Sequence, residues 1–297
     1  MAEPWQHFYQ SQRLRLSYWV WGDAGKPPLL LVHGNRDAAR SWDRIAEAFC
    51  DDYRVIAPDL RGHGDSEWTK GGYYGISEYI PDLVALLDLV GGKATVLAHS
   101  MGGRVTLATA GAFPEKFEKI AVIEGTGRPR AATLDFAPTP RRMREWVQRS
   151  RALEQGEQRV YPTFEDAVAR VREANKRLTP EMAEHITRWA ARGIDGGFVW
   201  KYDPWLYSDA QLDLRYEEMP ELWSTIECPV LHIISSEGEA MRANFLGKPV
   251  ESYFKQGQAA HAPDSGHWVH HDQTAFVIDQ VRAFLGTPPA RGGVAAQ

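Results

Sequence analysis

The chain has 297 residues, 43% of them hydrophobic and 25% charged, which is ordinary for a globular protein and excludes a disordered or fibrous chain. This length predicts one main domain with an insertion rather than two large domains. The formal net charge of -5, from 34 basic and 39 acidic residues, argues against a nucleic-acid-binding surface.

The N-terminal segment, MAEPWQHFYQ, has neither a basic leader nor an apolar run, and no stretch of the sequence is apolar over the length that a bilayer requires. We therefore expect a cytoplasmic protein with no membrane partner. The next segment, LRLSYWVWGD, is typical of a strand, and the residues from Gly22 to Pro28 are typical of a turn. We expect this strand to form an antiparallel edge.

From residue 27 onward, short apolar runs alternate with amphipathic helical segments. The runs are PPLLLVHG, YRVIAPDL, ATVLAHS and KIAVIEG, and the helical segments between them cover 37–50, 77–90 and 101–113. Continuous apolar runs of this length are typical of strands that are covered on both faces. The sequence therefore predicts an α/β fold with a mostly parallel central sheet and helices on both faces.

The alternation stops after KIAVIEG, where the sequence becomes helical in pattern, rich in arginine and tryptophan, and free of buried-strand runs. Thr163 followed by Asp166 predicts one helix start. Thr179 followed by Pro180 predicts another, with Gly193 past the end of that helix. Helices inserted at this point of an α/β core predict a lid over the site.

The strand pattern resumes with CPVLHIISS and QAAHAPDS, and a last helix is predicted from about residue 268 to 285. We therefore expect an α/β core made of residues 1–127 and 223–297, interrupted by a helical cap over residues 128–222.

Ser100 stands between an apolar strand and a helix in ATVLAHSMGGRVTLATA. A serine at a tight strand-to-helix turn projects its hydroxyl above the sheet, and the turn requires very small residues two positions before and after it. Those positions hold Ala98 and Gly102, so the sequence departs from the G-x-S-x-G pattern by one methyl group. This context predicts that Ser100 is a nucleophile.

Two backbone amides are candidates for stabilising the negative charge that develops beside such a serine. The amide of Met101 opens the following helix, whose N-terminus favours negative charge. The amide of Asn35 lies in the loop after LLLVHG, where a second donor is expected. We predict that Asn35 and Met101 form an oxyanion hole.

The sequence resembles the α/β-hydrolase superfamily through VHGN at 32–35, DLRGHGDS at 59–66, HSMGG at 99–103 and SGHWVHHDQ at 265–273. More narrowly it is similar to small cap-bearing bacterial serine esterase-like hydrolases, whose caps carry stretches like DGGFVWKYDP. The resemblance implies the fold and a serine nucleophile, but it does not define the substrate.

A serine hydroxyl needs an imidazole that takes its proton. His267 follows the last strand-like run in Asp-Ser-Gly-His, which is where the chain order of this fold places the base. His267, His270 and His271 also have a spacing that a metal site could use, but they lack the H-E-x-x-H pattern. We therefore predict that His267 is the base, and we expect neither a metal ion nor a cofactor.

The carboxylate that orients the base has three candidates. Glu124 ends the apolar strand KIAVIEG, where an unpaired buried carboxylate would be unfavourable, and it matches the placement in a minority of the resembling enzymes. Glu237 and Glu239 lie in SSEGE after the strand that follows the cap, where most of these enzymes carry an aspartate. We favour Glu124 and keep Glu237 and Glu239 open.

These residues predict a serine hydrolase that cleaves carboxylic esters of a small substrate through an acyl-enzyme. The same triad also serves thioester, lactone or carbon–carbon bond hydrolysis, and perhydrolysis. A hydrolase-fold receptor that binds a small ligand without turnover is the alternative from another class. The sequence leaves the substrate, the pocket-lining residues of the cap and the oligomeric state open.

Overall fold

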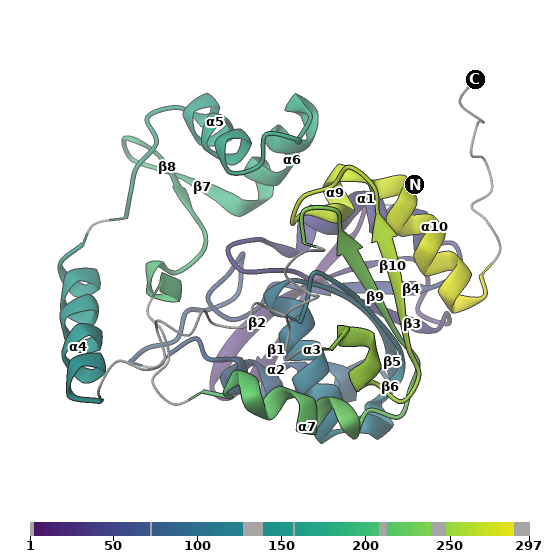
Figure 1. The fold of residues 1–297 in the computed structure, drawn as a ribbon. Helices are drawn as coiled ribbons and strands as arrows, with labels where there is room; N and C mark the ends of the chain where they lie inside the picture. The colour runs from purple at the N-terminus through teal and green to yellow at the C-terminus, as the bar shows by residue number, and fades with distance from the viewer. Residues whose placement is uncertain are drawn as a thin grey trace.

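The computed structural model describes residues 3–71, 73–126, 139–156, 158–207, 213–238 and 248–287. Its centre is an eight-stranded sheet in the order β1-β2-β4-β3-β5-β6-β9-β10 (Figure 1). The strands are β1 (Trp5–Ser11), β2 (Leu14–Trp21), β3 (Pro28–Val32), β4 (Arg54–Pro58), β5 (Ala94–His99), β6 (Phe117–Ile123), β9 (Val230–Ser235) and β10 (Gly257–Ala262).

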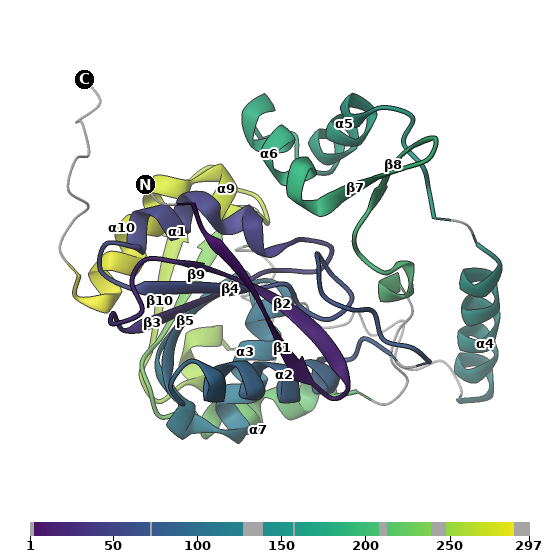
Figure 2. The same ribbon diagram turned by 180° about the vertical axis from the view of Figure 1, so that it is seen from behind.

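The sheet is parallel from β4 to β10, and the pairs β1–β2 and β2–β4 are antiparallel, so that β2 runs opposite to the other strands of this sheet. The antiparallel edge predicted for LRLSYWVWGD is therefore confirmed, with β1 added outside it (Figure 2). Parallel neighbours bring the carboxyl ends of β3, β5, β6, β9 and β10 to one edge of the sheet, where the loops after these strands meet.

Helices cover both faces of the sheet, as the apolar runs predicted. One face carries α2 (Ile76–Leu89), α3 (Met101–Ala112) and α7 (Met219–Ser224), and the other carries α1 (Asp43–Phe49), α9 (Val269–Asp272) and α10 (Thr274–Leu285). Along β3, Leu30 and Val32 join the first core, whereas Leu29 and Leu31 join the second. Side chains alternate between faces along a strand, so a strand between two helical layers must be apolar throughout.

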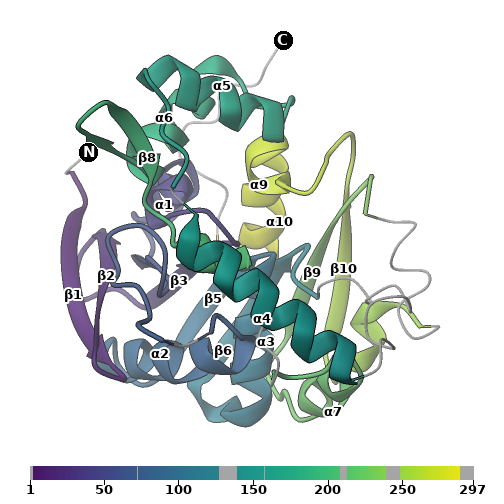
Figure 3. The same ribbon diagram turned by 90° about the vertical axis from the view of Figure 1, so that its left-hand side faces the viewer.

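The segment between β6 and α7 contains α4 (Thr139–Gln155), α5 (Phe164–Ala174), α6 (Pro180–Ala190), β7 (Ala191–Ile194) and β8 (Gly197–Trp200). α5, α6 and the β7–β8 hairpin lie together beyond the carboxyl edge of the sheet, and α4 stands apart at one side (Figures 1 and 3). Short 3-10 helices complete the described chain at Ala39–Trp42, Pro114–Lys116, Pro204–Tyr207, Tyr216–Glu218 and Val250–Tyr253.

Both predicted helix starts in this segment are confirmed. The Thr163 side chain accepts a hydrogen bond from the Asp166 amide in a capping box, and Thr179 caps the helix that begins at Pro180. Gly193 lies past the end of α6, as predicted, because α6 ends at Ala190 and Gly193 belongs to β7. The hairpin was not expected from the sequence, since strands of four residues are too short to show a period-two pattern.

The boundary between core and cap is best placed by packing. Met219 and Trp223 of α7 are fully buried in the core cluster that contains α2 and α3, so α7 packs as part of the core. We propose that the cap ends before Met219 rather than at residue 222. The other proposed boundary, at residue 128, lies outside the described residues.

Polar contacts join this segment to the core, among them those of Asn175, Arg177 and His185. Asn175 Nδ2 donates to Asp272 Oδ1 at 3.0 Å, and the Arg177 guanidinium pairs with Asp264 at 2.7 Å and with Glu237 at 3.0 Å. His185 of α6 lies 3.3 Å from Asp43 of α1. Within the part of the chain that the structure describes, none of the helices is both long and apolar enough to cross a membrane.

Candidate active site

Three predicted site residues meet at the carboxyl edge of the sheet although they are distant in sequence. Ser100 directly follows β5, Glu124 directly follows the neighbouring β6, and His267 lies in the loop after β10. His267 Nε2 is 2.8 Å from Ser100 Oγ, and His267 Nδ1 is 3.7 Å from Glu124 Oε2. The three side chains therefore form a continuous serine–imidazole–carboxylate chain.

Ser100 occupies a strained turn. Its backbone φ of 52° and ψ of -117° are unfavourable for a residue with a Cβ, and its amide donates to Ile123 O at 2.9 Å. A Cβ on Gly102 would lie 2.4 Å from the His33 carbonyl oxygen, which explains the requirement for glycine after the serine. Ala98, before the serine, is fully buried between β3 and β6, where its methyl group is accommodated.

Glu124 is anchored from the next strand. Its Oε1 accepts a hydrogen bond of 2.8 Å from the Ser235 amide, which leaves Oε2 directed toward His267. Its side chain is 7% exposed, and its φ of 53° is a second strained backbone conformation at the site. The distance of 3.7 Å to the imidazole is that of an ion pair rather than of a formed hydrogen bond, and such contacts often tighten when substrate binds.

The other two acid candidates differ from Glu124. Glu237 follows β9, but its side chain is 63% exposed and its Oε1 pairs with Arg177. Within the described residues Glu237 makes no hydrogen bond or ion pair with His267. Glu239 lies outside the described residues.

The loop after β3 carries the predicted oxyanion donor Asn35. His33 Nδ1–H donates to the Gly34 carbonyl at 2.7 Å, and the Arg36 amide donates to His63 Nε2 at 2.9 Å. These bonds hold the residues on both sides of Asn35. The amides of Asn35 and Met101 form no hydrogen bond with any other described residue, so both remain available to a ligand.

His99 is part of the site, and sequence reasoning missed this because its partner is distant in the chain. Its ring is 1% exposed, and burial lowers its pKa well below the usual value. His99 Nε2 lies 2.9 Å from the backbone carbonyl of His267, an acceptor that requires the proton on Nε2. This hydrogen bond fixes the position of the loop that carries His267. Because the proton is on Nε2, Nδ1 of His99 is unprotonated and carries a lone pair.

The loop 59–66 has a structural role in the described molecule. Asp59 accepts hydrogen bonds from the amides of Ala39 and Asp65, and burial raises its pKa to about 6. Arg61 forms a buried ion pair with Asp82 at 2.6 Å. Neither Asp59 nor Arg61 forms a hydrogen bond or an ion pair with Ser100 or His267 within the described chain.

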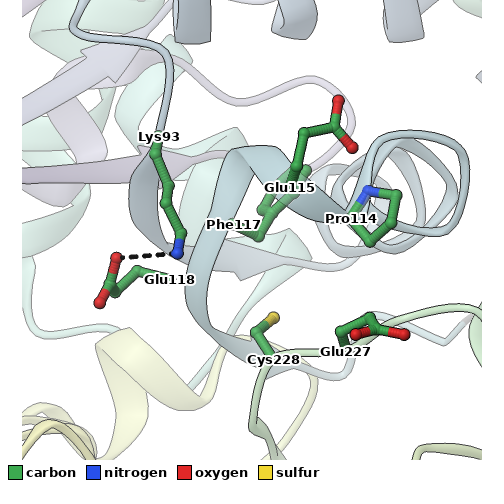
Figure 4. A pocket seen from close by; sticks show the side chains of 7 residues that line it. All are labelled: Lys93, Pro114, Glu115, Phe117, Glu118, Glu227 and Cys228. Atoms are coloured by element: carbon green, nitrogen blue, oxygen red, sulfur yellow. Dashed lines mark ion pairs between the residues drawn. The ribbon is translucent and has the colours of Figure 1, made fainter.

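A hollow of about 410 Å³ lies at the opposite edge of the sheet. Its lining residues precede β5, β6 and β9 or begin these strands: Lys93, Pro114, Glu115, Phe117, Glu118, Glu227 and Cys228 (Figure 4). Lys93 and Glu118 form an ion pair of 3.4 Å across it. Because parallel strands place their amino ends away from Ser100, this hollow is separate from the candidate active site.

Residues 29–280 match the alpha/beta hydrolase family. A serine hydrolase-like protein of Danio rerio is 26% identical over 273 residues, 90% of this chain and 83% of that protein. A 3-hydroxybutyrate-oligomer hydrolase of Cupriavidus necator is 28% identical over 273 residues, 85% of this chain and 87% of that protein. A solved structure of a hypothetical protein from Pseudomonas aeruginosa PAO1 has a TM-score of 0.81 and 26% identity, covering 95% of this chain and 99% of the other.

Proposed function

The chain belongs to the alpha/beta hydrolase family, and we propose that it is a serine hydrolase that cleaves carboxylic esters of a small substrate through an acyl-enzyme. The observation that carries the proposal is the contact of 2.8 Å between Ser100 Oγ and His267 Nε2, with Glu124 on the far side of the imidazole. Hydrolases among the relatives support hydrolysis in general.

In the proposed first step, Ser100 Oγ attacks the carbonyl carbon of the ester while its proton passes to His267 Nε2. The carbonyl electrons move to the oxygen, where the amides of Asn35 and Met101 donate to the oxyanion. The carbon–oxygen bond to the alcohol then breaks, and the alcohol leaves with the proton from His267. This leaves an acyl group on Ser100.

In the second half, water attacks the acyl carbon and gives its proton to His267 Nε2. Collapse of the second tetrahedral intermediate returns that proton to Ser100 Oγ and releases the carboxylic acid. All bonds and protons balance with water as the only co-reactant. Glu124 keeps the Nδ1 proton of His267 in place and stabilises the imidazolium.

The serine at position 100 argues against the chemistry of family members that attack with a carboxylate, since a serine cannot form their alkyl-enzyme ester from an epoxide or a haloalkane in the same way.

We propose that the cap, through the contacts of Asn175, Arg177 and His185 with the core, covers the acyl or alcohol side of the site.

A fluorophosphonate probe tests the nucleophile. We expect labelling of the wild type and of Ser224→Ala, an exposed serine on α7, and loss of labelling in Ser100→Ala. A wild type that stays unlabelled would favour the receptor alternative. A panel of p-nitrophenyl esters, thioesters and lactones then tests the bond, and a preference for thioesters or lactones over oxygen esters would overturn the ester assignment.

A further inference from the structure

Three metal-ligating side chains meet behind the candidate active site. Asp37, His99 and His270 each bring one ligand atom, and these atoms all lie within 4.8 Å of one another. His99 and His270 are each 1% exposed. The three residues come from the loop after β3, the end of β5 and α9, so only the tertiary structure brings them together.

Four polar atoms of this cluster have no hydrogen-bond partner within the described residues. They are Asp37 Oδ2, His99 Nδ1 and both ring nitrogens of His270. A buried polar atom without a partner is unfavourable by about 1–3 kcal/mol, so several in one place indicate that something binds there. The indole of Trp42 stacks on His270 at 4.6 Å and closes the cluster on one side.

We propose that Asp37, His99 and His270 bind a divalent first-row transition metal ion such as zinc. Two imidazole nitrogens and a carboxylate oxygen are a donor set that suits such ions. His99 is already prepared as a ligand, because its Nε2 proton is committed to the His267 carbonyl and its buried Nδ1 has no hydrogen-bond partner among the described residues. Asp37 supplies negative charge, and its other oxygen, Oδ1, accepts from the Ala38 amide.

The geometry requires a small adjustment. Ligand atoms on a tetrahedral zinc ion, at about 2.0–2.1 Å from the metal, are about 3.4 Å apart. Because the ligand atoms lie within 4.8 Å of one another, the side chains need to approach by no more than about 1.4 Å on binding. Three protein ligands leave a fourth position that water fills.

The ligands belong to the three segments that carry the candidate active site. Asp37 lies two residues after Asn35 in the loop after β3, and His99 directly precedes Ser100. His270 lies three residues after His267, in α9. A bound ion would therefore tie these segments together and stabilise the fold. Of His267, His270 and His271, only His270 belongs to the proposed metal site.

Zinc binding to the full chain tests the proposal directly. The protein is stripped with chelator, titrated with zinc chloride by calorimetry, and its metal content is measured after gel filtration. We expect about one zinc ion per chain and a higher melting temperature. Loss of a ligand in Asp37→Asn or His270→Gln should weaken zinc binding at least about 10-fold. Cobalt in place of zinc should give the visible bands of a four-coordinate ion in the wild type but not in these two ligand variants.

Two control variants separate this site from other zinc sites. His267→Gln removes the imidazole of the candidate active site, and His7→Gln removes an exposed histidine on β1. Zinc binding that persists in both control variants but is weakened in Asp37→Asn supports the proposal. Asparagine has the same shape as aspartate and keeps the hydrogen bond from the Ala38 amide, so this variant removes only the charged ligand oxygen. The proposal is overturned if zinc is not retained by the wild type, if Asp37→Asn and His270→Gln retain it unchanged, or if His267→Gln abolishes it. The first outcome would leave ordered water as the partner of these atoms.

Discussion

Glu124→Gln places an amide where the structure has a carboxylate 3.7 Å from His267 Nδ1. The glutamine carbonyl can keep the hydrogen bond from the Ser235 amide, so its NH2 group then faces the imidazole. Two donors cannot pair, and the imidazole is driven to the tautomer with its proton on Nε2. In that tautomer His267 cannot accept the proton of Ser100.

The expected loss follows from two effects. Coulomb attraction between an imidazolium and a carboxylate at this distance is about 4–5 kcal/mol at an effective dielectric constant of about 20. Because the His267 side chain is 45% exposed, solvent screening reduces this to about 2 kcal/mol, or about 30-fold in rate. The wrong tautomer of His267 lowers the rate further, since replacing the carboxylate of such a triad by an amide can lower kcat by about 10⁴-fold. We expect kcat/KM to fall between about 10²- and 10⁴-fold.

The assay is p-nitrophenyl butyrate hydrolysis at pH 8, with the rate of fluorophosphonate labelling as a second readout. Glu237→Gln is the matched control, because Glu237 lies in the loop after β9 and pairs with Arg177. The activity of this variant should stay within about 3-fold of wild type. A nearly active Glu124→Gln together with a Glu237→Gln protein that has lost about 10²-fold or more would refute the assignment. If both variants remain active, Glu239→Gln decides.

Further predictions concern stability. Gly102→Ala should lower the free energy of unfolding in urea by about 1–3 kcal/mol, since its Cβ would meet the His33 carbonyl oxygen, whereas Gly25→Ala, where a Cβ meets nothing within 4 Å, should change it little. Burial raises the pKa of Asp59 to about 6, so wild-type stability should fall by about 2 kcal/mol, relative to Asp59→Asn, as the pH rises from 4 to 7; an unchanged difference contradicts this. The hydrogen bond to Asp43 raises the pKa of His185, so protection of α6 in hydrogen exchange should be greatest below pH 6.5 and should decline as His185 deprotonates, a pH dependence absent in His185→Gln.

Local patterns in the sequence were sufficient for much of the fold. The apolar runs predicted the parallel strands because a strand between two helical layers buries both its faces, and Ser100 stands between β5 and α3 as its flanking residues indicated. Thr163 and Thr179 predicted helix starts because a capping side chain bonds an amide only three residues away. The β7–β8 hairpin was missed, because such short strands depend on packing more than on pattern.

The sequence by itself determined the residues whose surroundings are local: the turn at Ser100, the glycine at position 102 and the strands that deliver them to one edge. Only the tertiary structure decided which side chains face one another across that edge. Glu124 and Glu237 both follow parallel strands, yet the order β5-β6-β9-β10 and the Ser235 amide direct Glu124 to His267, while Arg177 holds Glu237. The meeting of Asp37, His99 and His270 has the same origin, since contacts between distant segments depend on strand order and helix packing rather than on spacing along the chain.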